Sequence, residues 1–186
     1  MNPNAASLVL LSCGDSAQIS ALQTAAAAPL AHVLQLTLHH GLSAGPGSDN
    51  GNAAQQALAA LPPACLAALP LDPGLPLEVG LGHWAAELGA ARQPCVLLLS
   101  AAQAASGVPA AATALLRQWQ VPLVGLAQWG SPWDAEARRH DALPWLGWLD
   151  AGAGVGDGSA DAPVGGTEAL VLSTKLHWRQ RLVELS

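Results

Sequence analysis

The sequence predicts an α/β fold, specifically a three-layer α/β/α domain with a mostly parallel central sheet. Three observations support this class. Short apolar segments alternate with Ala- and Leu-rich segments of helical character from residue 7 to residue 149. The apolar segments are bounded by Gly, Pro, Asn and Asp, which favour turns. The clearest one, 94–100 (PCVLLLS), is apolar at nearly every position, as expected for a strand covered on both faces.

The first half of the chain contains the expected start of the sheet. Residues 7–12 (SLVLLS) are an apolar run that ends in the turn Cys13-Gly14-Asp15-Ser16, so we expect a strand followed by a loop. The Ala-rich helix that follows, 19–28, is expected to stop at Pro29, because proline has no N–H for the helical ladder. The other expected elements are a strand at 32–38, a loop at 41–52, a helix at 53–61, a helical turn at 64–69, a turn-rich stretch at 71–76 and a strand at 77–80.

The second half continues the alternation. Pro109 suits the first turn of a helix over 109–120. The other expected elements are a helix at 82–91, strands at 94–100, 121–128 and 143–149, and a helix at 133–140. We therefore expect one α/β domain over residues 1–150. Residues 151–166 are rich in Gly, Ala and Asp and are expected to form a mobile linker. Residues 167–186 then form an extension with a strand at 168–173 and a helix at 175–185.

Charge is scarce and unevenly distributed. Only 11% of the residues are charged and the net charge is −6, while residues 1–91 contain no Lys and no Arg. A surface so poor in cations cannot neutralise a phosphate backbone or an anionic lipid surface, so we expect neither nucleic acid nor membrane as a partner. No apolar run reaches the ~18 residues that span a bilayer.

The cysteines and tryptophans are expected to be mainly structural. Three cysteines, Cys13, Cys65 and Cys95, form no CxxC pair, and no basic secretory signal is visible, so we expect reduced thiols in a cytoplasmic protein. Phe and Tyr are absent, and all aromatic surface comes from seven Trp. Five of them crowd into the second half and either fill the core or form a binding patch: Trp119, Trp129, Trp133, Trp145 and Trp148.

Candidate ligand-binding residues follow the predicted strands. Functional sites in parallel α/β folds lie at the carboxyl ends of the strands, where the connecting loops meet. Because few cations are available there, we expect a neutral or apolar small molecule, or a protein surface reached through Trp133. The candidate site residues are Gly14, Asp15, Ser16, Glu78, Gly80, His83, Gln128 and Trp133; the same loops also carry His39, His40, Gln103 and Ser106.

Two other chemistries would use residues of these loops. Gly14-Asp15-Ser16 resembles the start of GDS-type serine hydrolases, with Ser16 as the nucleophile, but the Asp-x-x-His pair that would activate it does not occur in the sequence. Glu78, His83 and Glu87 could supply metal ligands, yet their spacing matches no established zinc motif. We therefore expect no metal and assign no catalytic residue.

Residues 77–149 resemble the C-terminal half of dethiobiotin synthetase, a P-loop family that also includes ParA-type ATPases. Residues 94–100 (PCVLLLS) match the family's "PVLLV" strand, and a Gly-bearing loop and a helix follow. Residues 121–126 (VPLVGL) are similar to its "LPLAGV" strand, and 143–149 (LPWLGWL) to its closing "LPVLGxLP" segment. The resemblance implies a P-loop NTPase-like topology.

The departures from that family fall on its chemistry. The Gly-Lys-Thr of its phosphate loop is missing after the first strand, and the only lysine of this chain is Lys175. Of its Glu-Gly-Ala-Gly-Gly stretch only Glu78, Gly80 and Gly82 correspond, and Gln128 stands at its base-reading Asn. The resemblance thus implies a degenerate relative without a P-loop, which has lost ATP hydrolysis and binds a small molecule or a protein, with a possible homodimer. An active synthetase-like enzyme using ATP and Mg is the alternative.

Overall fold

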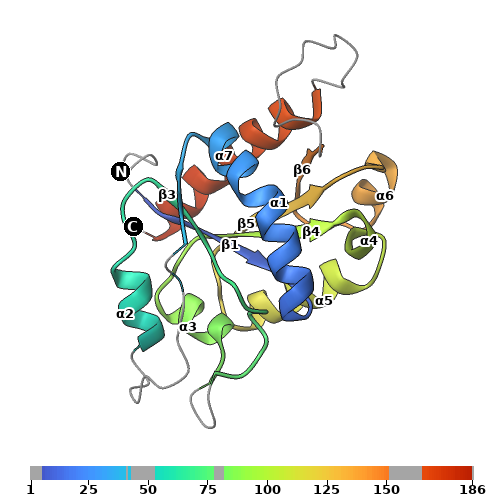
Figure 1. Ribbon diagram of the computed structural model, residues 1–186. Coiled ribbons are helices and arrows are strands. Elements are labelled where there is room, and N and C mark those ends of the chain that lie inside the picture. The colour runs from blue at the N-terminus through green and yellow to red at the C-terminus, as the bar shows by residue number, and fades with distance from the viewer. Residues whose placement is uncertain (1–5, 41, 43–52, 78–81, 151–164, 186) are drawn as a thin grey trace.

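The computed structural model describes residues 6–40, 42, 53–77, 82–150 and 165–185 (Figure 1). Six strands form one sheet in which all neighbouring pairs are parallel, in the order β2-β3-β1-β4-β5-β6. The α/β class and the parallel sheet that the sequence predicts are confirmed. The strands are β1 (Leu8–Ser12), β2 (Thr37–His39), β3 (Cys65–Ala68), β4 (Cys95–Ser100), β5 (Leu123–Trp129) and β6 (Trp145–Leu149).

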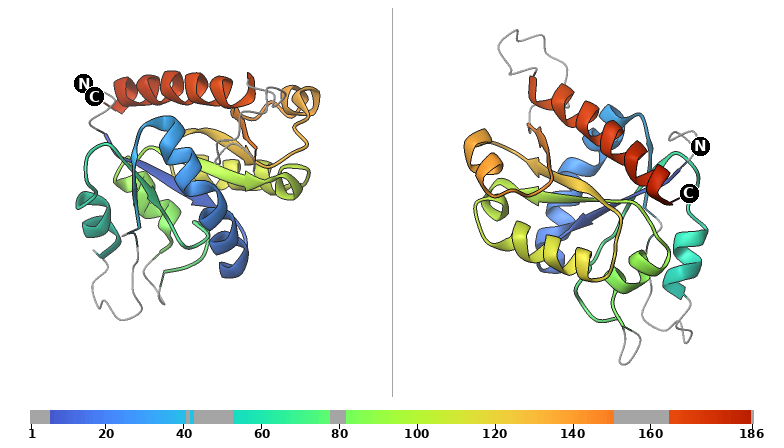
Figure 2. Two further views of the ribbon diagram at one scale, coloured as in Figure 1. Left: turned by 45° about the horizontal axis from the view of Figure 1, so that its top comes forward. Right: turned by 180° about the vertical axis from the view of Figure 1, so that it is seen from behind.

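Helices cover both faces of the sheet, which gives the expected three layers. Helices α1 and α7 pack on one face, and α2, α3 and α5 pack on the other (Figure 2). None of the described helices combines the length and apolar character that a membrane crossing requires. The helices are α1 (Ser16–Leu34), α2 (Ala53–Ala59), α3 (Trp84–Ala90), α4 (Ala101–Ala104), α5 (Val108–Gln118), α6 (Ala135–His140) and α7 (Gly165–Leu185).

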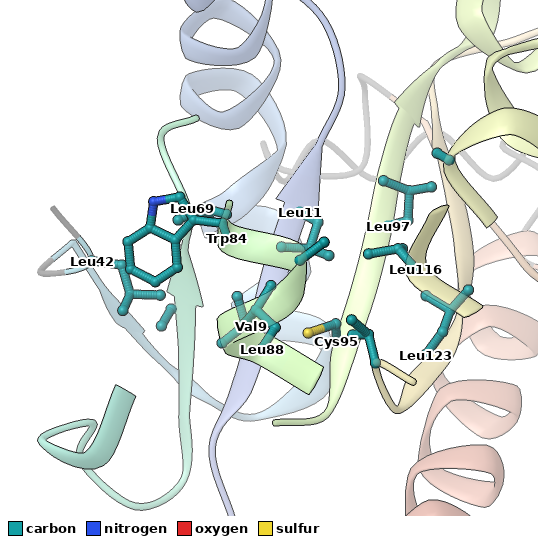
Figure 3. Close-up of a cluster of buried hydrophobic side chains, with 14 of the residues drawn as sticks. Val9, Leu11, Leu42, Leu69, Trp84, Leu88, Cys95, Leu97, Leu116 and Leu123 are labelled. Atoms are coloured by element: carbon teal, nitrogen blue, oxygen red, sulfur yellow. The ribbon is translucent and has the colours of Figure 1, made fainter. Parts of the chain in front are cut away.

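The core is split into two apolar clusters by the sheet, because successive side chains of a strand point to opposite faces. In β4, Cys95 and Leu97 join the cluster under α3 and α5 (Figure 3), whereas Val96 and Leu98 join the cluster under α1 and α7. Residues 96–99 are at most 1% exposed. The prediction that this strand is central and buried on both faces is confirmed.

One sequence prediction in the first half is wrong about the sheet, and a second lies almost entirely outside the described residues. Residues 64–69, predicted as a helical turn, contain strand β3, whose four side chains are all buried between β2 and β1. Ala and Leu favour a helix locally, but pairing with β1 overrides that propensity. Of the strand predicted at 77–80, only Leu77 lies within the described residues, and it belongs to no strand; an isolated bridge joins Pro76 to His83.

Two helices extend beyond their predicted limits. Helix α1 continues through Pro29 to Leu34, because Leu30, Ala31 and Leu34 are buried against the sheet, so the strand predicted at 32–38 shrinks to Thr37–His39. The strand predicted at 168–173 is instead part of α7. Its buried side chains recur every four residues, as a helix requires: Leu170, Thr174, Trp178 and Leu182.

Candidate functional site

The carboxyl ends of β1 and β3 are joined by the carboxylate of Asp72. Only Cys13, Gly14 and Asp15 separate strand β1 from helix α1. The backbone N–H of Gly14 donates to Oδ2 of Asp72 at 2.9 Å, and the N–H of Gly74 donates to its Oδ1 at 2.8 Å. Asp72 therefore ties the loop after β3 to the loop after β1, across 58 residues of sequence.

The start of α1 is closed by its own side chains. The carboxylate of Asp15 accepts the N–H of Gln18 at 2.8 Å, and the side-chain oxygen of Gln18 accepts the N–H of Asp15 at 3.1 Å. This reciprocal capping box satisfies two donors that a helix N-terminus otherwise offers to a ligand. Ser16 is exposed at the first turn. Within the described residues its hydroxyl makes no hydrogen bond to an imidazole.

Gly14 is required by the geometry of this short loop. Its φ is +124°, a conformation that L side chains rarely adopt, and a Cβ there would collide with the side chain of Gln18. The loop thus has the glycine of a tight strand-to-helix turn. It lacks the length that wraps a phosphate, and the two carboxylates at its donors, Asp15 and Asp72, would repel one.

Helix α4, which directly follows β4, is bound to the loop after β1. The side-chain amide of Gln103 in α4 donates to the carbonyl oxygen of Cys13 at 2.6 Å, while its oxygen accepts the N–H of Ser100 at 2.9 Å. Burial, with a smaller contribution from the negative charge of Asp72, raises the pKa of the Cys13 thiol from 9.0 to about 12. Cys13 is therefore a protonated thiol at neutral pH and no nucleophile.

The amide of Gln128 shapes the segment that presents Trp133. Gln128 is fully buried near the end of β5, and its Nε2 donates to the carbonyl oxygens of Gly130 and Pro132, at 2.8 Å each. These two bonds fix the turn that leads to Trp133. Oε1 of Gln128 is buried without a hydrogen-bond partner among the described residues. Gln128 and Trp133, two of the candidates from the sequence, thus belong to one structural unit.

Trp133 belongs to an aromatic group beside β6. Its ring stacks on Trp148, with centroids 5.2 Å apart and an angle of 15° between the planes, and meets Trp145 edge to face at 5.8 Å. The guanidinium of Arg138 lies over the Trp145 ring, 4.6 Å from its centroid. The indole N–H of Trp145 donates to the carboxylate of Asp141 at 2.8 Å. All three indoles are half-buried, whereas Trp84 and Trp178 elsewhere are core residues.

An open cavity of about 660 Å³ lies next to this group, between α4 and α6. Its walls are mostly small and apolar, from Ala101, Ala102, Ala104, Ala105, Pro109, Pro132 and Leu143, with Ser106, Asp134, Ala137, Arg138 and Asp141 completing them. We call this the carboxyl-edge groove. Asp134 is already engaged as the cap of α6, and Asp141 accepts from Leu143 and Trp145.

The remaining candidate residues lie apart from one another or outside the described residues. Glu78 and Gly80 lie outside the described residues. His83 caps helix α3 by accepting the N–H of Ala86 on Nδ1, at 3.3 Å, and packs edge-on against Trp119. His39 ends β2 at the edge of the sheet. In the described ranges, no three His, Cys, Asp or Glu side chains gather as a metal site would need.

Asp72 was missed by the sequence reasoning, and so were Arg138 and Asp141, which line the groove that lies at the expected carboxyl edge. The Asp72-Pro73-Gly74 turn gave a signal, because a turn of this kind often follows a strand. Comparison of the chain with known protein families, with curated proteins and with solved structures finds no match.

Proposed function

We propose that this chain is a binding module, related in fold to dethiobiotin synthetase, that does not hydrolyse ATP. The observation that carries the proposal is the hydrogen bond from the N–H of Gly14 to the carboxylate of Asp72. At this position a P-loop directs its N–H groups to a phosphate. Here the protein's own carboxylate takes that donor, and the capping box takes the N–H groups of Asp15 and Gln18.

The absence of a lysine supports the same proposal. In a P-loop, a lysine stabilises the negative charge that develops on the transferred phosphoryl group. The only lysine of this chain, Lys175, lies in α7 and not in the loop after β1. A nucleotide would have to displace Asp72 and would meet two carboxylates without a compensating cation. In this proposal the bond between Gly14 and Asp72 has a structural role, because it connects the loops after β1 and β3.

The ligand of the module binds in the carboxyl-edge groove. The volume of about 660 Å³ lies within the range of small-molecule sites. Most polar side chains of the groove already have partners within the protein. Asp134 caps α6, and Asp141 accepts the indole N–H of Trp145. Arg138 pairs with Asp141 at 3.6 Å and lies over the Trp145 ring. Contact with alanine, proline and leucine side chains then dominates recognition, which favours a neutral, largely apolar molecule.

A neutral fluorescent probe, N-phenyl-1-naphthylamine, tests this function. Ala105 is exposed and lines the groove, whereas Ala114 is exposed on α5 and does not line it. We expect the probe to bind the unmodified protein and the Ala114→Trp variant alike, and Ala105→Trp to reduce its binding at least tenfold by filling the groove. Equal binding by the two variants would exclude the groove as the ligand site. A thermal shift with Mg-ATP that survives in Ala105→Trp would favour the enzyme alternative.

A further inference from the structure

Three arginines line one cavity at the opposite edge of the sheet. The cavity has a volume of about 500 Å³ and is lined at the amino ends of β5 and β6 by Val121, Pro122, Leu123 and Pro144. Arg92 follows α3, Arg117 lies in the last turn of α5, and Arg181 extends from α7. We call this the amino-edge cavity. It gathers three of the seven basic residues of a chain whose net charge is −6.

Two of the guanidinium groups are held in place by the protein. Nε of Arg181 donates to the carbonyl oxygen of Leu123 at 3.2 Å, and its Nη1 pairs with Oε2 of Glu184 at 2.7 Å. Nη2 of Arg92 donates to the backbone oxygen of Glu184 at 3.2 Å. The guanidinium of Arg117 has no hydrogen-bond or ion-pair partner within the described residues. Of about fifteen N–H donors, at five per guanidinium, most remain available to a ligand.

The charge of the cavity is not balanced by its surroundings. Among the described residues, Glu184 is the one carboxylate of the lining. Helices α3, α5 and α7 end near this edge, and each helix end contributes about half a negative charge. The three positive guanidinium charges exceed the summed negative charge of Glu184 and the three helix ends. The cavity therefore attracts anions, although the protein as a whole repels them.

We propose that the amino-edge cavity binds a small organic anion through a carboxylate or phosphate group. The planar fork of arginine matches the oxygens of both groups, so Arg92 and Arg117 would hold the anionic end. The apolar wall of Val121, Pro122 and Pro144 would receive the carbon part of the ligand. This site is separate from the carboxyl-edge groove and does not depend on the function proposed for that groove.

Calorimetric titration with two probes, citrate and inorganic pyrophosphate, tests the site at constant ionic strength. Arg117→Gln removes one charge without breaking an internal bond. Arg179→Gln is the matched control, because Arg179 is also exposed and lies outside the cavity lining. We expect at least one probe to bind, about tenfold more weakly to Arg117→Gln, and equally well to Arg179→Gln and the unmodified protein. The preferred probe identifies the anionic group.

A second variant should change affinity in the opposite direction. Glu184→Gln removes the carboxylate that pairs with Arg181. The anion then no longer competes with Glu184 for the Arg181 guanidinium and should bind several-fold more tightly. A misfolded variant cannot produce a gain of this kind. The proposal is overturned if neither probe binds, if both arginine variants bind alike, or if Glu184→Gln fails to tighten binding.

Discussion

Replacing Asp72 by alanine should detach the loop after β1 from the loop after β3. The variant loses two hydrogen bonds to a charged acceptor, the half-buried one from Gly14 and the exposed one from Gly74. A half-buried bond to a carboxylate contributes about 1.5–2 kcal/mol and an exposed one about 0.5–1 kcal/mol, so the free energy of unfolding should fall by about 2–3 kcal/mol. For a chain of this length the melting temperature then falls by about 5–10 °C.

Urea denaturation followed by tryptophan fluorescence measures this change. Asp72→Asn should fall between the alanine variant and the unmodified protein, because its side-chain oxygen still accepts one of the two N–H groups. Glu136→Gln serves as the control. Glu136 is exposed on α6, and among the described residues the one basic group near its carboxylate is His140, at 3.9 Å, so the substitution should cost less than 0.5 kcal/mol. If Asp72→Ala also costs less than 0.5 kcal/mol, Asp72 does not brace the loop.

Three further predictions follow from the packing. Gly89→Ala should destabilise the protein by about 1–3 kcal/mol in urea denaturation, because its Cβ would collide with the backbone oxygen of Trp119, whereas Gly107→Ala, with open space around it, should be neutral or stabilising. Trp133→Ala should cost about 1–3 kcal/mol through its two ring contacts. Burial is the main cause that raises the pKa of Cys13 to about 12, and it also raises that of Cys95. The free energy of unfolding should therefore keep its full value below pH 9 and should fall as the pH rises above it.

A different result would contradict each of these predictions. Equal stability of the Gly89→Ala and Gly107→Ala proteins would mean that α3 does not approach α5 so closely. An unchanged fluorescence spectrum and unfolding midpoint for Trp133→Ala would mean that its ring is not stacked. For the thiols, the unfolded state loses protons near pH 9 while the folded state keeps them. A Cys13→Ala variant should therefore lose stability less steeply above pH 9 than the unmodified protein, and parallel curves would contradict the raised pKa.

The sheet could be predicted where a strand is apolar by itself. Residues 94–100 combine β-branched and leucine side chains without a polar break, and only a doubly covered strand accommodates them. Strand β3 could not be predicted in this way. Its sequence, CLAA, favours a helix, and only the pairing with β1 and β2, from distant parts of the chain, decides for a strand. The start of α7 was also predicted wrongly. The short apolar run at 168–173 is typical of a strand, but it is part of a longer segment with helical periodicity.

The candidate site was predictable in its location more than in its contacts. Because parallel strands bring their following loops to one edge, the sequence placed Gly14, Gln128 and Trp133 at the same edge. The partner of Gly14 could not be found, since Asp72 follows a strand that the sequence did not reveal. The amino-edge cavity was missed for a related reason. Its arginines are far apart in the sequence and meet only through the fold.

The central claim is that the loop after β1 is closed by the protein's own carboxylates and does not hold a nucleotide. Titration of Mg-ATP into the Arg117→Gln protein by calorimetry tests it most directly, because this variant weakens the amino-edge cavity as a competing phosphate site. We expect no binding in the micromolar range. Micromolar affinity for Mg-ATP in this variant, lost when Gly14 is replaced by alanine, would show that the loop holds phosphate after all.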